Sequence, residues 1–159
     1  MAFSIFPSAS SAAIPDNLRW FAMIYLFGTV GAMIVMGVLA SMGVDLPGAG
    51  VSAGLFFGIV ALAVQRLAKV REIPKPERTK LALGYMLIAL AISLFLLGLL
   101  LVLAVVLAGP EMLAQMIPLN AQMLGIFAIA LIAVSLLYFG GARFVVGIVA
   151  QRTIRESNS

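Results

Sequence analysis

The sequence predicts an all-α protein, a four-helix transmembrane bundle with both termini in the cytoplasm. Hydrophobic residues make up 64% of the 159-residue chain and charged residues only 10%, whereas about a quarter of the residues in a soluble domain are charged. Short polar connections separate four stretches that are almost free of charge, each long enough for the roughly 20 residues that cross a bilayer. All lysines and arginines lie in segments that this arrangement places on one side.

The first predicted helix covers residues 19–42. Pro15 precedes it, and Asp16 or Asn17 is expected to cap it, because short polar side chains accept hydrogen bonds from the free N–H groups of a first helical turn. Arg19 suits the cytoplasmic boundary, where a long cationic side chain reaches the lipid headgroups. Three small residues of this helix form a patch that is expected to serve helix packing: Gly28, Gly31 and Ala32.

The second predicted helix covers residues 49–67 and carries Gly50, Gly54 and Gly58 at a spacing of four. Small residues at this spacing line one face of a helix and let another helix approach closely. We therefore expect close packing of this face against the first helix or against another subunit. The alternative is a glycine face that lines a channel.

A basic loop at residues 66–80 separates the second helix from the third. Pro74 and Pro76 prevent one continuous helix through this stretch. Its cations are expected to contact lipid headgroups and to hold the loop in the cytoplasm. They are Arg66, Lys69, Arg71, Lys75, Arg78 and Lys80.

The third and fourth predicted helices cover residues 81–108 and 123–150. A short helix at about residues 111–117 is expected to lie on the outer membrane surface between them. The short connections on that side predict antiparallel neighbours in the bundle. Arg143 is expected either to reach the inner headgroups or to face inward and bind an anionic group of a lipid or partner.

The distribution of charge predicts the orientation in the membrane. With both termini inside, all ten lysines and arginines lie on the inner side, whereas Asp45 and Glu111 lie on the outer side with no base. Basic residues remain in the cytoplasm of bacterial inner-membrane proteins, so this orientation is the one we expect. The basic loop then contacts lipids, and the pattern argues against nucleic-acid binding.

The absence of cysteine and histidine excludes whole classes of chemistry for this chain acting alone. Thiolate and imidazole metal sites, histidine-ligated haem and Ser–His–Asp catalysis all require these residues. Three methionines on the outer side could offer thioether ligands to Cu(I), but without a companion ligand we interpret them as apolar contacts: Met112, Met116 and Met123. We expect no enzyme activity, no metal and no cofactor.

Two stretches, PERTKLALGYMLIALAISLFLLGLLL and LLYFGGARFV, carry a family resemblance. In these stretches the chain resembles a family of small, uncharacterised four-span bacterial inner-membrane proteins. The shared features are a basic central loop, a polar start to the third helix and an arginine after the fourth. The resemblance implies four helices and brings no activity with it.

Two functions follow as hypotheses. The first is a non-catalytic accessory, assembly or structural subunit that packs beside a larger inner-membrane complex, with membrane lipids and another membrane protein or a second copy as partners. The alternative is a small oligomeric transporter or channel component. Coupled transporters usually carry a charged group within the membrane, and this assignment places no Asp, Glu, Lys or Arg in the membrane interior.

Overall fold

The structure is a computed structural model that describes residues 9–44, 47–109 and 121–157. Within these ranges the chain forms four long helices and no strand, which confirms the all-α bundle. The helices are α1 (Ala9–Ser41), α2 (Gly48–Ala68), α3 (Lys75–Ala108) and α5 (Ala121–Ser157). The short surface helix expected at residues 111–117 lies outside the described residues.

Each of the four helices is long and apolar enough to cross a membrane. The candidate spans are Ala13–Ser41, Gly50–Ala68, Lys75–Leu107 and Gly125–Arg152. α3 has 34 residues, about 51 Å at 1.5 Å per residue, which exceeds the roughly 30 Å of a hydrocarbon core. A helix of this length tilts in the bilayer or extends beyond it.

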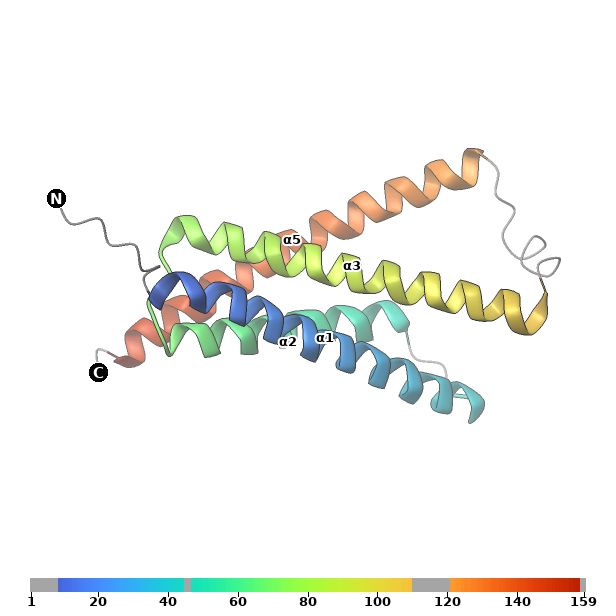
Figure 1. Cartoon of the computed structure of the whole chain (residues 1–159), viewed down its shortest axis with the longest axis horizontal. Coiled ribbons are helices and arrows are strands. Elements are labelled where there is room, and N and C mark those ends of the chain that lie inside the picture. The colour runs from blue at the N-terminus through green and yellow to red at the C-terminus, as the bar shows by residue number, and fades with distance from the viewer. Residues whose placement is uncertain (1–8, 45–46, 110–120, 158–159) are drawn as a thin grey trace.

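The four helices pack in the cyclic order α1, α2, α5, α3. The hairpin pairs α1–α2 and α3–α5 are antiparallel, but α1–α3 and α2–α5 are parallel neighbours (Figure 1). The antiparallel neighbours expected from the short outer connections are confirmed for the two hairpins, and the other two sides of the bundle pair helices that the outer connections do not join. Since α2 and α3 lie across the bundle from each other, the short connection between them crosses one end diagonally.

Two helices begin well before the residues at which the sequence predicts their start. α1 begins at Ala9 with Pro15 inside the helix, so neither Asp16 nor Asn17 caps its start. α3 begins at Lys75, with Pro74 as its N-cap and Pro76 in its first turn. Proline fits there, because the first-turn N–H groups have no helical partner and its φ angle already suits the helix.

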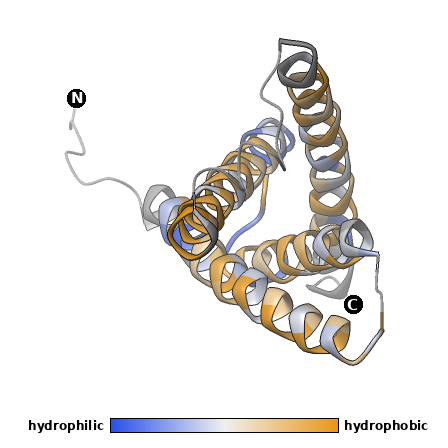
Figure 2. Cartoon of the chain, turned by 90° about the vertical axis from the view of Figure 1, so that its right-hand side faces the viewer, coloured by the Kyte–Doolittle hydropathy of each residue, from blue (hydrophilic) through white to orange (hydrophobic). Residues whose placement is uncertain are grey.

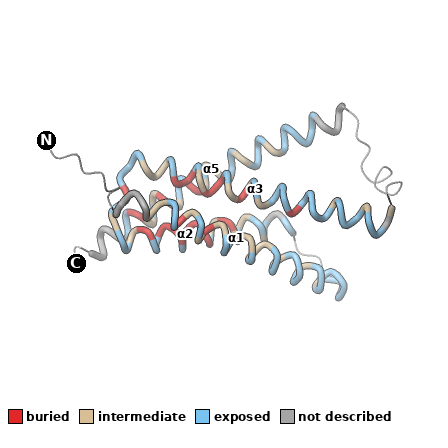
Figure 3. The backbone as a smooth tube through the Cα atoms, in the orientation of Figure 1, coloured by how far each residue is buried: buried red, intermediate tan, exposed pale blue. Residues whose placement is uncertain are grey.

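The buried core occupies only one half of the bundle. Buried side chains gather toward the end that holds the start of α1 and the α2–α3 connection, whereas the other end is exposed (Figure 3). Toward that exposed end the helices diverge, as the view along the bundle shows (Figure 2). Apolar side chains such as Phe27 and Leu107, 72% and 77% exposed, cover the outer surface, as expected for a surface that lipid covers.

Candidate functional site: a polar link above an aromatic layer and an apolar cavity

A buried polar link joins three helices at the packed end of the bundle. The Asn17 side chain of α1 is 4% exposed. Its Nδ2 donates to the backbone oxygen of Ala63 in α2 at 2.8 Å, and its Oδ1 accepts from the Tyr85 hydroxyl of α3 at 2.5 Å. Because buried polar groups are destabilising unless they are hydrogen-bonded, this pair of bonds ties the three helices in one register.

An aromatic layer lies next to this link and fills the bundle interior. Phe21 stacks on Tyr25 with 5.6 Å between ring centroids and lies 4.7 Å from the Tyr85 ring. Phe56 of α2 meets the Tyr138 ring of α5 edge-on at 4.5 Å. Aromatic pairs at these separations stabilise a fold beyond the area they bury. We use the name aromatic layer for Phe21, Tyr25, Phe56, Phe57, Tyr85 and Tyr138.

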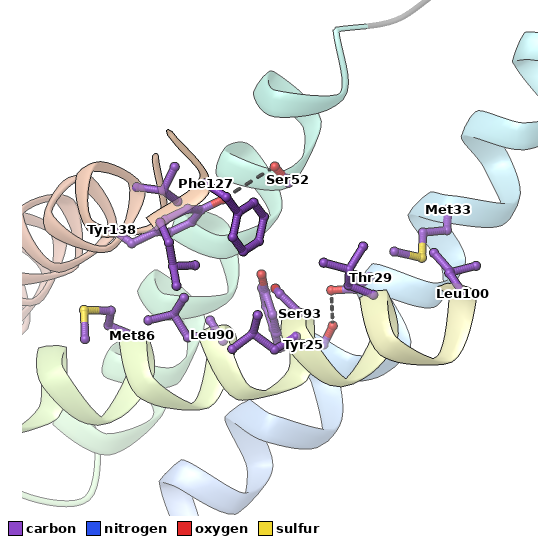
Figure 4. Close-up of a pocket in the computed structure, with 15 residues that line it drawn as sticks. Tyr25, Thr29, Met33, Ser52, Met86, Leu90, Ser93, Leu100, Phe127 and Tyr138 are labelled. Carbon is purple, nitrogen blue, oxygen red and sulfur yellow. Dashed lines mark hydrogen bonds between the residues drawn. The ribbon is translucent and has the colours of Figure 1, made fainter. Parts of the chain in front are cut away.

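Beyond the aromatic layer, a half-open apolar cavity of about 350 Å³ lies between the diverging helices. All four helices contribute to its wall (Figure 4). The lining residues include Tyr25 and Tyr138 of the aromatic layer, together with apolar side chains such as Met33, Leu100 and Phe127. No lining residue is charged.

Five hydroxyl groups line the cavity, and each already has a partner in the protein. Thr29 Oγ1 donates to the backbone oxygen of Tyr25 at 2.7 Å, one turn earlier in the same helix. The Ser93 side chain is a hydrogen-bond partner of the Tyr25 hydroxyl. Tyr138 approaches Ser52 at 3.5 Å between the oxygens. Bonding to the helix itself or to a neighbouring helix is the arrangement expected for hydroxyls in membrane helices.

The small residues chosen for helix packing fall into two groups. A Cβ atom on Gly28 would lie 3.3 Å from a Leu55 methyl group and 3.4 Å from an Ile59 methyl group, so this glycine does bring α1 close to α2. Ala32 is partly buried on the same helix. A Cβ atom on any of the others would meet nothing within 4 Å: Gly31, Gly50, Gly54 and Gly58.

The glycine face of α2, defined as Gly50, Gly54 and Gly58, is therefore exposed in the single chain. The expectation that this face packs on α1 is wrong, because α2 turns Leu55 and Ile59 toward Gly28 of α1 instead. Contact of the face with another subunit stays a prediction.

The cations of the basic loop lie at the packed end, and three of them have defined partners. Arg66 lies over the Trp20 ring, 5.2 Å from its centroid, which joins α2 to α1 through a cation–π contact. Arg71 pairs with Glu77 at 2.5 Å between Nη2 and Oε2. Arg78 donates from Nε to the backbone oxygen of Ile73 at 3.2 Å.

The remaining predicted headgroup contacts are exposed side chains. Lys69, Lys75 and Lys80 are exposed at the packed end, as is Arg19. Arg143 is exposed on α5 and does not face into the bundle, and its contact with headgroups or with an anionic group of a partner stays a prediction. In the described part of the chain, no three His, Cys, Asp or Glu residues come together as a metal site would require.

Two contacts between helices were not predicted from the sequence. Asn17 follows a proline and an acid, a pattern typical of a helix start. Its contact with Tyr85 is visible only in the folded chain, because the two residues are far apart in the sequence. Gly141 of α5 contacts the Phe57 ring of α2 so closely that no side chain fits between them, although the adjacent Gly140 meets nothing.

No family model, no curated protein and no solved structure matches this chain.

Proposed function

We propose that the chain is a multi-pass protein of a bacterial inner membrane, with its packed, basic end in the cytoplasm. Four helices long and apolar enough to cross a membrane support the membrane location. The chain's ten lysines and arginines support the orientation, since α1 begins, α5 ends and α2 joins α3 at the same end of the bundle. Basic segments are held on the cytoplasmic side.

Single cysteines test this orientation directly, because the natural chain has none. Val44→Cys places a thiol at the far end, where Val44 is 46% exposed, and Lys75→Cys places one in the basic loop. We expect a membrane-impermeant maleimide to label Val44→Cys in intact spheroplasts and Lys75→Cys only after lysis. Labelling of Lys75→Cys from outside would overturn the orientation.

The function we propose is that of a non-catalytic accessory or assembly subunit that packs beside a larger membrane complex. The observation that supports it best is the glycine face of α2, which lies within a candidate span and has no helix against it. A small-residue face lets a partner backbone approach closely, and dispersion contacts then hold the two helices together in lipid. A lipid or headgroup role for the basic loop is compatible with the same placement.

Capture of the tagged chain from its native membrane in mild detergent, followed by mass spectrometry, tests the subunit proposal. We expect a membrane protein at stoichiometric yield with the natural chain and its loss with Gly54→Leu, because the leucine side chain blocks close approach. Gly98→Leu is the matched control, since Gly98 of α3 is also exposed with nothing within 4 Å of an added Cβ. A chain that purifies alone, or equal loss with both variants, would contradict the proposal.

The alternative, a small oligomeric transporter or channel component, is favoured by the presence of a cavity between the helices. Two observations weigh against a path through the single chain. The aromatic layer fills the packed end, where Phe21, Phe56 and Tyr85 are fully buried, and the cavity has no charged lining residue. A path would therefore have to run between copies, and solute flux into reconstituted vesicles would favour it.

A further inference from the structure

The cavity beyond the aromatic layer has no role in the subunit proposal, and its chemistry identifies an occupant. We infer that it holds one hydrocarbon chain of a membrane phospholipid. All of its lining residues belong to the four candidate spans, so the medium around its opening is the hydrocarbon of the bilayer. An empty space of this size would leave its lining atoms without dispersion partners, whereas an acyl chain from the adjacent leaflet supplies them.

The wall selects an apolar occupant over a polar solute. Polar recognition requires hydrogen-bonding groups that are free to point at the ligand. The five hydroxyls of this wall instead interact within the protein, as with Thr29 and the Tyr25 backbone oxygen and with Tyr138 and Ser52. The surface that remains is formed by side chains such as Met86, Leu90 and Leu131.

The size of the cavity favours a single chain over a helix of a second copy. Its volume of about 350 Å³ falls in the range of roughly 300–1,000 Å³ that small-molecule pockets occupy. A helix with its side chains is about 10–12 Å across and is too thick for this space. Tyr25 and Tyr138 belong to its wall, and an acyl chain would enter from the end where the helices diverge.

A photoactivatable lipid tests the inference. The full chain is reconstituted in vesicles of phosphatidylglycerol and phosphatidylethanolamine, a fraction of the latter carrying a diazirine at the end of one acyl chain. After irradiation, mass spectrometry maps the adducts. We expect adducts on cavity residues such as Leu90 and Leu131, and about tenfold fewer of them in Val134→Phe, because the added ring occupies the volume that the chain needs. Val134 lines the cavity from α5.

Leu137→Phe is the matched control, because Leu137 lies on the same helix, is 73% exposed and does not line the cavity. We expect its cavity adducts to equal those of the natural chain. Helicity and gel filtration show whether Val134→Phe folds. If it does not, Leu97→Trp replaces it as the filled variant, because Leu97 lines the cavity from α3. Cavity adducts that persist in a folded filled variant, or that fall equally in Leu137→Phe, would overturn the inference.

Discussion

Asn17→Leu is expected to lower the free energy of unfolding by about 2 kcal/mol, because it leaves the buried Tyr85 hydroxyl without its acceptor and removes a bond between α1 and α2. Leucine is close to asparagine in size, so the loss reflects the polar link more than a cavity. Unfolding in a denaturing detergent can be followed by the fluorescence of Trp20. It is the only tryptophan of the chain and lies one helical turn from Asn17.

Asp16→Leu is the control for this variant, since Asp16 is the preceding residue and is exposed. Its effect is expected to stay within about 0.5 kcal/mol, as is usual for surface substitutions. A double-mutant cycle with Tyr85→Phe isolates the bond between the two side chains. If Asn17→Leu and Tyr85→Phe are additive, or if Asn17→Leu unfolds no more readily than Asp16→Leu, the link does not stabilise the bundle.

Gly141→Ala is expected to destabilise the bundle by about 1–3 kcal/mol, the usual loss of stability when a packed site receives an extra group. The new methyl group would overlap the Phe57 ring. The ring has little room to move, since it meets Phe56 at 5.2 Å and Tyr138 at 5.9 Å between centroids. The same denaturant titration measures the effect. Phe57→Leu in the Gly141→Ala background is expected to restore part of the stability by making room.

Gly140→Ala is the matched control, because the two glycines are adjacent on α5 and only Gly141 has a close neighbour. At Gly140 the exchange is expected to be neutral or to stabilise by up to about 1 kcal/mol, the difference in helix propensity between the two residues. Equal effects at the two positions would show that α2 and α5 do not approach each other here.

The number of helices was predictable from the sequence, and their partners were not. Long uncharged stretches such as residues 81–108 report only that a segment suits hydrocarbon, and every face of such a helix is apolar. The sequence therefore holds no periodic signal that tells the face toward a neighbour from the face toward lipid. For this reason the sequence left open whether the glycine face of α2 packs on α1 or on another subunit, and only the structure shows that α2 contacts Gly28 through Leu55 and Ile59.

For the candidate site, the sequence shows which types of residue lie within the spans but not which of them meet. The sequence places hydroxyls such as Thr29 within the spans, and in the structure this one donates to the backbone of its own helix. It gives no sign that Asn17 and Tyr85, 68 positions apart, meet in the interior. The start of α3 was missed for a local reason, because proline is compatible both with the residue before a helix and with its first turn.

The polar link of Asn17 has a consequence for the order in which the bundle assembles. The hairpin of α1 and α2 is synthesised first, and in it the Asn17 amide can already donate to Ala63. Its oxygen has no partner until Tyr85 arrives with the second hairpin. Asn17 therefore makes both of its bonds to other helices only after the second hairpin has packed against the first.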